Sequence, residues 1–430
     1  MNIAIYTLGC KVNQYETQAM ETILRGHGHT LVDFEDAADA YIINTCTVTA
    51  VSDKKSRQVI RRARRMNPDA VVAVCGCFVQ TDPEAVAALD VDLFSGTGGR
   101  TEFLDRLEEL IRERQAAPLG LVDEAMRRRT FEVLPAGGME GRTRALLKVE
   151  DGCVNFCTYC IIPYARGPIR SLPLDRAVEE TKRLAAEGYH ELVLTGIEIS
   201  SWGHDLNRSQ SLIDLVEAVC LAAPELRVRL GSLEPRTITE DFCRRAGALP
   251  NLCPHFHLSL QSGCDATLKR MNRKYDTARY LKSVELLRQA YDRPAITTDL
   301  ITGFPGETEE EFSATLEFIR TCGFSSMHIF PYSRREGTPA DRMPEQVVKS
   351  VKEERAHRAA EVAAELERSY LESWVGHRLP VLFEEEKNGL WRGHAPNYVE
   401  VWASSPENLH NVQRNVTITG LRETGLLGKL

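Results

Sequence analysis

Three cysteines, Cys153, Cys157 and Cys160, stand in the run Glu-Asp-Gly-Cys-Val-Asn-Phe-Cys-Thr-Tyr-Cys. Three thiolates at this spacing can bind three irons of a [4Fe–4S] cluster from one loop and leave the fourth iron without a protein ligand. An open iron can bind a small molecule and pass it an electron. A structural zinc site takes four ligands, and no histidine follows at the spacing of a zinc finger. The run therefore favours a cluster over zinc, with the ring of Tyr159 beside it.

Three more cysteines, Cys10, Cys46 and Cys77, each stand at the end of a predicted strand. In an open α/β sheet ligands bind outside the carboxyl ends of the strands, so thiols at three such ends can converge although they are far apart in sequence. The alternative is three buried core cysteines. Core cysteines would lie within strands, as Cys75 does. We therefore expect Cys10, Cys46 and Cys77 to bind a second cluster.

The elements that must position these cysteines begin with a strand–helix alternation over residues 1–112, which predicts a doubly wound parallel α/β domain. The predicted strands are Asn2–Thr7, Ala40–Thr45, Ala70–Val74 and Val91–Phe94, and the predicted helices are Asn13–Arg25, Ser52–Met66 and Asp82–Leu89. Residues 113–143 are charged and punctuated by Gly and Pro, so we interpret them as a linker.

A second alternation over residues 144–366 has six repeats, which predicts an open (β/α)₆ partial barrel. The predicted strands are Ala145–Glu150, Glu191–Thr195, Arg227–Gly231, His255–Leu260, Ala295–Ile301 and Met327–Pro331. Helical patterns at Asp175–Glu187, Ser211–Ala222 and Glu309–Thr321 separate some of them, and a helical tract follows from Glu345 to about Trp374.

Active sites of such barrels gather at the carboxyl ends of the strands. The first cysteine run follows the first strand. Gly196 and Glu198 follow the second and are candidates to hold an amino-acid moiety, whereas Ser232 and Glu234 follow the third and are candidates for a ribose. Gln261 follows the fourth strand. We expect these residues and Tyr159 to bind the cofactor.

Residues 367–430 alternate as short strands, Leu379–Glu385, Leu390–His394, Tyr398–Trp402 and Asn415–Leu421, which predict a small β-barrel. Aromatic rings next to Arg and His in this part are typical of single-stranded RNA binding, although some must form the core of so small a barrel. These rings are Phe383, Trp391, Tyr398 and Trp402.

The net charge of −8 argues against indiscriminate nucleic-acid binding over the whole surface but leaves room for a local basic patch. An acid-free helical run from Lys54 to Arg65 is one candidate, although a solvated helix face is the usual explanation of such runs. Four arginines are further candidates for contacts with RNA: Arg166, Arg170, Arg334 and Arg335.

The chain has 430 residues and 12 cysteines, without an N-terminal secretory signal or an apolar run long enough to span a bilayer. Cysteine-rich chains of this kind keep their thiols reduced for metal or redox chemistry. We therefore expect a cytoplasmic protein without a membrane partner.

With these motifs the chain resembles the radical S-adenosylmethionine methylthiotransferases over essentially its full length. The six cysteines named first carry the resemblance, and the C-terminal part looks like a TRAM domain, an RNA-binding module of this family. The segments His257–Cys264, Leu268–Arg273, Phe330–Arg335 and Gly337–Pro339 are most similar to the MtaB branch, which acts on N6-threonylcarbamoyladenosine at position 37 of tRNA. One departure is Ser171-Leu172, where family members usually have Arg after the serine.

The resemblance implies two [4Fe–4S] clusters and S-adenosylmethionine as cofactors. The cluster on Cys153, Cys157 and Cys160 would cleave S-adenosylmethionine to a 5′-deoxyadenosyl radical, which takes a hydrogen atom from C2 of the modified adenine. The cluster on Cys10, Cys46 and Cys77 would present the sulfur, methylated by a second S-adenosylmethionine. The implied partners are a tRNA anticodon stem-loop, an electron donor such as a flavodoxin or ferredoxin, and a sulfur source.

Three other functions remain open from the sequence. A related enzyme acts on isopentenyl-adenosine in tRNA, and a basic residue near the substrate, such as Arg334 or Arg335, would favour the threonyl group instead. A second relative methylthiolates an aspartate of a ribosomal protein. A zinc-stabilised RNA-binding protein without catalysis is the third, and bound iron and sulfide would exclude it.

Overall fold

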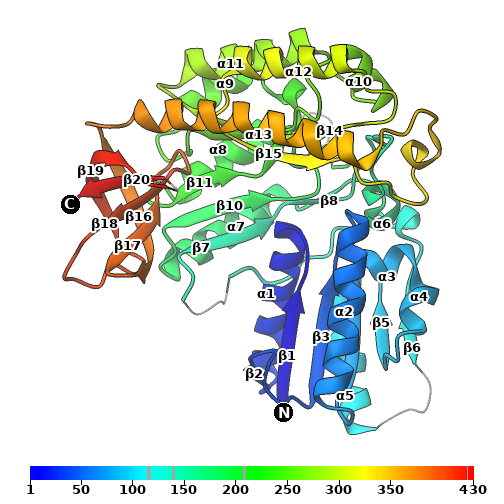
Figure 1. The fold of residues 1–430 in the computed structure, drawn as a ribbon. Coiled ribbons are helices and arrows are strands. Elements are labelled where there is room, and N and C mark those ends of the chain that lie inside the picture. Colours follow the sequence, from blue (N-terminus) through cyan, green and yellow to red (C-terminus); the bar gives the residue numbers. More distant parts are fainter. Residues whose placement is uncertain (114–117, 138–140, 207–209, 424) are drawn as a thin grey trace.

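The computed structural model describes residues 1–113, 118–137, 141–206, 210–423 and 425–430. It has three parts (Figure 1): an N-terminal six-stranded sheet, a central partial barrel above it and a small closed barrel at one side. The predicted fold class is confirmed.

The N-terminal sheet is parallel throughout and has the strand order β2-β1-β3-β4-β5-β6. Its strands are β1 (Asn2–Thr7), β2 (Thr30–Val32), β3 (Ala40–Thr45), β4 (Val71–Gly76), β5 (Leu93–Ser95) and β6 (Leu119–Leu121). The order reverses between β1 and β3, which makes the carboxyl ends of these two strands the switch point where open α/β sheets bind ligands.

Helices cover both faces of this sheet because its strand residues alternate between two apolar cores. Helices α1 (Lys11–Gly26) and α5 (Arg100–Arg112) pack on the face that carries Ile42, whereas α2 (Ala50–Met66), α3 (Cys77–Thr81) and α4 (Pro83–Ala87) pack on the face that carries Tyr41 and Ile43. The sequence pattern did not predict β2 and β6. Both are three-residue edge strands, too short to show a period.

Strand β6 lies within the segment expected to be a linker and pairs with β5. Residues 114–117 and 138–140 of that segment lie outside the described residues.

The central part contains six strand positions in chain order, as predicted. They are β7 (Arg144–Lys148), β10 (Glu191–Thr195), β11 (Arg227–Leu230) continued by β12 (Ser232–Leu233), β13 (His255–Leu258), β14 (Ala295–Thr302) and β15 (Ser326–Pro331). The third strand is split at Gly231, so that β11 pairs with β10 and β12 pairs with β13. The Gly231 amide donates to the Leu194 carbonyl at 2.8 Å, and a Cβ at this position would lie 3.0 Å from that oxygen.

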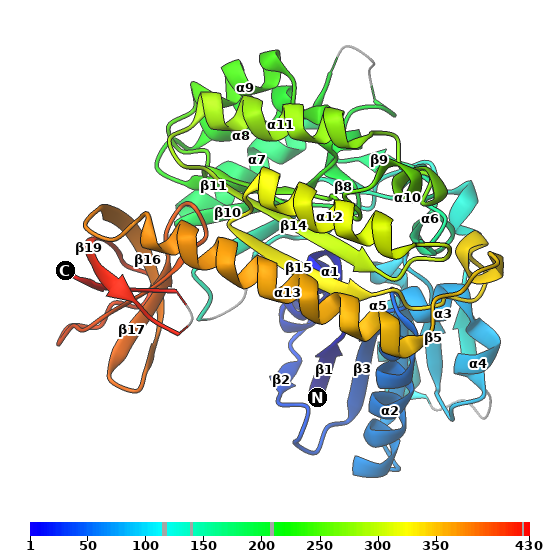
Figure 2. The same ribbon diagram turned by 45° about the horizontal axis from the view of Figure 1, so that its top comes forward.

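Helices on the outside of the barrel connect these strands. They are α6 (Ile162–Arg166), α7 (Leu174–Ala186), α8 (Leu212–Ala222), α9 (Glu240–Gly247), α10 (Asp265–Arg270), α11 (Thr277–Ala290) and α12 (Glu309–Cys322). Capping boxes at Ser211 and Thr308 satisfy the free amides at the starts of α8 and α12. The long helix α13 (Lys349–Glu372) runs along β15 and leads into the last part (Figure 2).

The C-terminal part is a closed five-stranded barrel with the order β16-β17-β18-β20-β19. The strands are β16 (Arg378–Lys387), β17 (Leu390–His394), β18 (Glu400–Ala403), β19 (Gln413–Leu421) and β20 (Leu426–Lys429). The sequence pattern missed β20, which closes the barrel by pairing with β18 and β19. Phe383 and Trp391 lie in the core, as expected for some of the aromatic rings.

Tyr398 reaches from this barrel into the central part. Its ring stacks between the rings of His255 and His394, with 5.0 Å between centroids on each side, and the Arg229 guanidinium lies 4.8 Å from its centroid. Tyr398 adopts a φ of +65°, a conformation that is uncommon for a residue with a side chain. The C-terminal barrel is thus locked against the start of the central strands.

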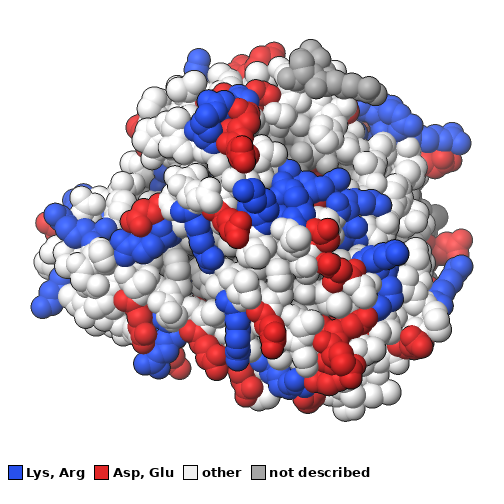
Figure 3. Space-filling view, turned by 90° about the horizontal axis from the view of Figure 1, so that it is seen from above, with Lys and Arg blue, Asp and Glu red and all other residues white. Residues whose placement is uncertain are grey.

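No helix among the residues that the structure describes is long and apolar enough to cross a membrane. On the face of the molecule seen in Figure 3, basic and acidic side chains are intermixed, in keeping with the moderate net charge of −8.

Candidate active site

The loop that carries Cys153, Cys157 and Cys160 joins β8 (Glu150–Asp151) to α6. Backbone hydrogen bonds fix its shape: the Cys153 amide donates to the Gly167 carbonyl at 3.0 Å, and the Cys160 amide donates to the Cys157 carbonyl at 2.9 Å. Gly152 has a φ of +94°, and a Cβ there would collide with the Pro168 carbonyl oxygen, so the loop requires glycine before its first cysteine.

The thiols of this loop are held in a poorly solvated place. Burial raises the pKa of Cys153 and raises that of Cys160 to about 12. The Arg273 guanidinium donates to the Cys157 sulfur at 3.1 Å. A positive charge beside this sulfur favours the thiolate that a metal needs. Arg273 was missed by the sequence analysis, because a single arginine more than a hundred residues away carries no local signal.

Cys46 and Cys77 directly follow β3 and β4, and Cys10 follows β1 after two residues, at the carboxyl edge of the N-terminal sheet. Cys10 and Cys46 flank the switch point. A Cβ at Gly9, next to Cys10, would lie 3.0 Å from the Cys46 sulfur, so these two segments lie close together. Burial raises the pKa of Cys77 to about 12. Cys75 lies in the apolar core, as expected.

Asn13 of α1 ties the segments of this second set together. Its side-chain amide donates to the Leu8 carbonyl at 2.7 Å and to the Thr45 carbonyl at 2.9 Å, just before Cys10 and Cys46 in the chain. Its oxygen accepts a hydrogen bond from Arg166 at 2.8 Å. Arg166 follows the first cysteine loop, so two side chains link the two sets of cysteines.

A buried cluster of charges surrounds this link. Glu16 of α1 pairs with Arg166, with Arg100 at 3.1 Å and with Lys148 at 3.4 Å. Burial raises the pKa of Glu16, but the three cations outweigh it, so the pKa lies well below its ordinary value. Asp151 adds contacts to Lys148 at 3.3 Å and to Arg166 at 3.5 Å. The sheet and the barrel are therefore joined by ion pairs that water does not reach.

These contacts correct the interpretation of Arg166 and Arg170 as RNA-binding residues. Arg166 has no exposed surface and Arg170 almost none. Arg170 donates to the Pro168 carbonyl at 2.6 Å and pairs with Asp151 at 3.4 Å. A guanidinium enclosed in this way cannot reach a phosphate of RNA, so both residues hold the interface instead.

Arg334 and Arg335 have different surroundings. Arg334 is exposed and pairs with Asp341 at 2.9 Å. Arg335 is largely buried and bonds to Asp53 and Thr47, the residue after Cys46. Arg335 thus connects the sixth strand of the barrel to the second cysteine set, and its role in RNA binding stays a prediction.

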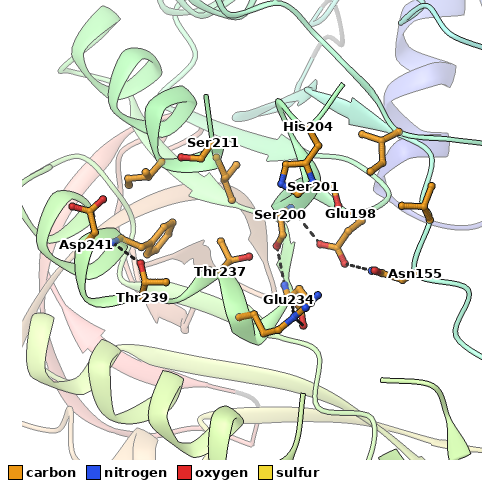
Figure 4. A pocket seen from close by; sticks show the side chains of 16 residues that line it. Asn155, Glu198, Ser200, Ser201, His204, Ser211, Glu234, Thr237, Thr239 and Asp241 are labelled. Atoms are coloured by element: carbon orange, nitrogen blue, oxygen red, sulfur yellow. Dashed lines mark hydrogen bonds and ion pairs between the residues drawn. The ribbon is translucent and has the colours of Figure 1, made fainter. Parts of the chain in front are cut away.

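Two of the predicted cofactor residues, Glu198 and Glu234, line a cleft of about 540 Å³ beside the first cysteine loop (Figure 4). The Asn155 amide donates to Glu198 at 3.4 Å, and the Glu234 amide donates to Ser200 at 2.9 Å. Burial raises the pKa of Glu198 to about 7. Among the described residues no cation forms an ion pair with this half-buried carboxyl group, so it is a suitable partner for an ammonium group.

The other predicted cofactor residues lie around the same strand ends but do not line this cleft. Gly196 lies against Glu150, where a Cβ would be 2.8 Å from the backbone oxygen. Ser232 is exposed, whereas Gln261 is buried and its backbone bridges to β14. Tyr159 packs edge-on against Phe304, with 6.4 Å between ring centroids. Their contacts with a cofactor stay predictions.

Comparisons with known proteins agree with this arrangement. Residues 147–319 match the model of the Radical SAM superfamily, and residues 2–96 match that of the uncharacterized protein family UPF0004. The chain is 41% identical to the threonylcarbamoyladenosine tRNA methylthiotransferase MtaB of Bacillus subtilis, over 95% of this chain and 91% of that protein. The chain belongs to the radical S-adenosylmethionine methylthiotransferase family.

Other relatives and structures extend the comparison. The MtaB protein of Thermotoga maritima is 38% identical over 93% of this chain and 90% of its own. A tRNA-2-methylthio-N(6)-dimethylallyladenosine synthase of Pelotomaculum thermopropionicum is 32% identical over 99% of this chain and 97% of its own. The structure of the radical methyltransferase TsrM from Kitasatospora setae shares the fold, with a TM-score of 0.56 and 19% identity over 79% of this chain and 75% of that one.

Membership in the family confirms the predicted class of enzyme, and with it [4Fe–4S] clusters and S-adenosylmethionine as cofactors. The donors are present: all 12 cysteines are free thiols, and they include three in the loop after β8 and three that follow β1, β3 and β4. Among the described residues neither set is drawn together around a metal-sized site. Which thiols hold which cluster is a matter for the proposal below.

Proposed function

We propose that the chain methylthiolates C2 of N6-threonylcarbamoyladenosine at position 37 of tRNA, with the sulfur delivered at a cluster on Cys10, Cys46 and Cys77. Cys153, Cys157 and Cys160 would hold the cluster that binds S-adenosylmethionine. When bound, these cofactors supply the radical and the sulfur. The observation that carries the proposal is that Asn13 and Arg166 join the chain segments beside Cys10 and Cys46 to the segment that follows the first cysteine loop.

The protein's own residues position the cofactors and the substrate. Arg273 orients the Cys157 sulfur, and Asn155 with Glu198 lies at the wall of the cleft next to the loop. Glu198 would pair with the ammonium group of the bound amino-acid moiety, which would bring its pKa down from about 7. The buried ion pairs around Glu16 keep the two strand-end edges at a fixed separation.

The relatives favour the threonylcarbamoyl substrate over the alternatives. Four MtaB proteins are 36–41% identical and a fifth is 32% identical, whereas three dimethylallyladenosine synthases are 32–34% identical. A tRNA anticodon stem-loop would be the partner, with an external electron donor and a sulfur source. The RNA base would have to leave its stack to enter the barrel.

Iron and sulfide content of the anaerobically reconstituted protein tests the cluster assignment. Wild type should hold about eight irons, and the variant with Cys153, Cys157 and Cys160 all changed to Ala about four. A wild type without iron, or with zinc in its place, would overturn the proposal.

The substrate is tested with two anticodon stem-loops, one with threonylcarbamoyladenosine and one with dimethylallyladenosine at position 37. Nucleosides from the reactions are separated by chromatography and identified by mass spectrometry. We expect the methylthio product from the first RNA. Product from the second RNA alone would assign the chain to the other substrate.

A further inference from the structure

A second cleft lies where the three parts of the molecule meet. It has a volume of about 520 Å³. All three parts contribute side chains to it, and those that matter here are Lys11, Gln14, Arg144, Arg229, Arg392 and Tyr398. None of these residues belongs to the cleft beside the first cysteine loop.

This cleft lies against two strands of the barrel. Leu146 of β7 and Val193 of β10 line it. Alternate residues of a strand share a face, so Lys148 and Thr195 follow on the same face toward the carboxyl ends of these strands. Those ends carry the first cysteine loop. The cleft thus lies on the same inner face of the barrel, with the buried Lys148 between it and the strand ends.

Most cations around the cleft already have carboxylate partners. Arg144 pairs with Glu384 at 2.8 Å, Arg229 with Glu191 at 2.7 Å and Arg392 with Glu385 at 3.0 Å. Lys11 and the exposed Arg142 are the exceptions. Among the residues that the structure describes, no carboxylate or carbonyl bonds to the charged group of either side chain.

Lys11 shares the cleft with Arg144, Arg229 and Arg392. A cation that lacks a partner and is surrounded by other cations would be stabilised by an incoming anion. Lys11 directly follows Cys10, at the edge of the second cysteine set.

We propose that this cleft binds the carboxylate of the substrate's threonyl group, with Lys11 as the residue that pairs with it. The inference rests on the proposed function. A base whose C2 faces the second cysteine set would extend its N6 substituent past Cys10. A threonylcarbamoyl group ends in an anion, whereas a dimethylallyl group is hydrocarbon and gains nothing from a lysine and three arginines. Lys11 therefore selects between the two substrates.

The test measures the dissociation constants of three anticodon stem-loops for the reconstituted holoenzyme by fluorescence anisotropy. The RNAs carry threonylcarbamoyladenosine, its methyl ester or plain adenosine at position 37. The ester removes the charge without changing the protein. Wild type should bind the acid at least about tenfold more tightly than the ester, as expected of one charge-assisted pair.

Variants then assign the effect to one residue. Lys11→Met should bind acid and ester equally, and Lys11→Arg should restore the preference for the acid. Lys182→Met, which removes an exposed lysine of α7 on the outside of the barrel, is the matched control and should behave as wild type. Iron content measured beside each variant shows whether the neighbouring Cys10 site is intact.

Three results would overturn the inference. Wild type that binds acid and ester equally tightly would show that the protein does not recognise the charge of the threonyl carboxylate. A Lys11→Met protein that keeps the preference would assign it elsewhere. Equal weakening of all three RNAs by Lys11→Met would make Lys11 a phosphate contact. If wild type forms methylthio product but shows any of these results, only this inference fails; if it forms no product from the acid RNA, the proposed function fails first.

Discussion

Cys153, Cys157 and Cys160, the loop set, lie in one loop, whereas Cys10, Cys46 and Cys77, the sheet set, follow the ends of three strands of a sheet. The loop set is held by its own backbone hydrogen bonds and by Arg273. The sheet set depends on strand order and on Asn13, whose contacts cross to the barrel. The same number of thiols can therefore be positioned locally or by the whole fold, and the two solutions should respond differently to mutation.

Removing one thiol from each set gives the largest contrast. Cys157→Ala should abolish cleavage of S-adenosylmethionine and all thiolation, because the loop set would hold the cofactor. Cys46→Ala should still produce 5′-deoxyadenosine but no methylthio nucleoside. Chromatography with mass detection measures both products. Loss of 5′-deoxyadenosine in Cys46→Ala would show that the two sets do not divide the reaction in this way.

Glu16→Gln should disturb the sheet set more than the loop set. It removes the carboxylate from among Arg166, Arg100 and Lys148 and leaves buried cations unpaired. Breaking a buried pair costs about 3–5 kcal/mol. Urea unfolding measures the loss, and exposed Glu109→Gln on α5 is the control. Equal stability of Glu16→Gln and wild type would mean that these pairs contribute nothing net.

Two glycines at positive φ allow a matched comparison of the backbones. Gly76, with a φ of +105°, precedes Cys77, and a Cβ there would lie 2.5 Å from the Thr45 carbonyl oxygen. Gly152 precedes Cys153. Alanine at either position should cost about 1–3 kcal/mol of strain. We expect Gly76→Ala to lose iron from the sheet set and Gly152→Ala to lose iron from the loop set. Iron content and 5′-deoxyadenosine formation measure both losses, because only the loop set would support formation of 5′-deoxyadenosine. The same result in both variants would mean that the two glycines do not support separate clusters.

The smallest effect is a pH dependence. Nearby cations hold the pKa of Glu16 below its ordinary value of 4.5 in the folded protein. Such a group stabilises the fold above the unfolded pKa and loses this contribution as the pH falls through the folded pKa. The stability difference between wild type and Glu16→Gln should thus be full at pH 7 and shrink below about pH 4.5. A difference that stayed constant down to pH 3 would mean that Glu16 is not ionised in the fold.

Much of this arrangement could be predicted from the sequence, since strand ends and cysteine spacing are local signals. The six barrel strands and the position of Cys46 after β3 follow directly from apolar runs. Contacts across the interface left no such signal. Arg166 was predicted to contact RNA, since nothing local in the sequence reveals its partner Glu16, which lies 150 residues away. Long-range pairing, rather than residue type, decides whether a charge is structural or free.

The stacking of Tyr398 between His255 and His394 bears on how this enzyme could be altered by exchange of parts. Because Tyr398 of the C-terminal barrel lines the cleft shared by the three parts, that barrel cannot be exchanged without changing the cleft. A hybrid that takes its last sixty or so residues from a relative would have a different cleft wall as well as a different surface. We expect such hybrids to function only when the residue at Tyr398 and the two histidines come from the same parent.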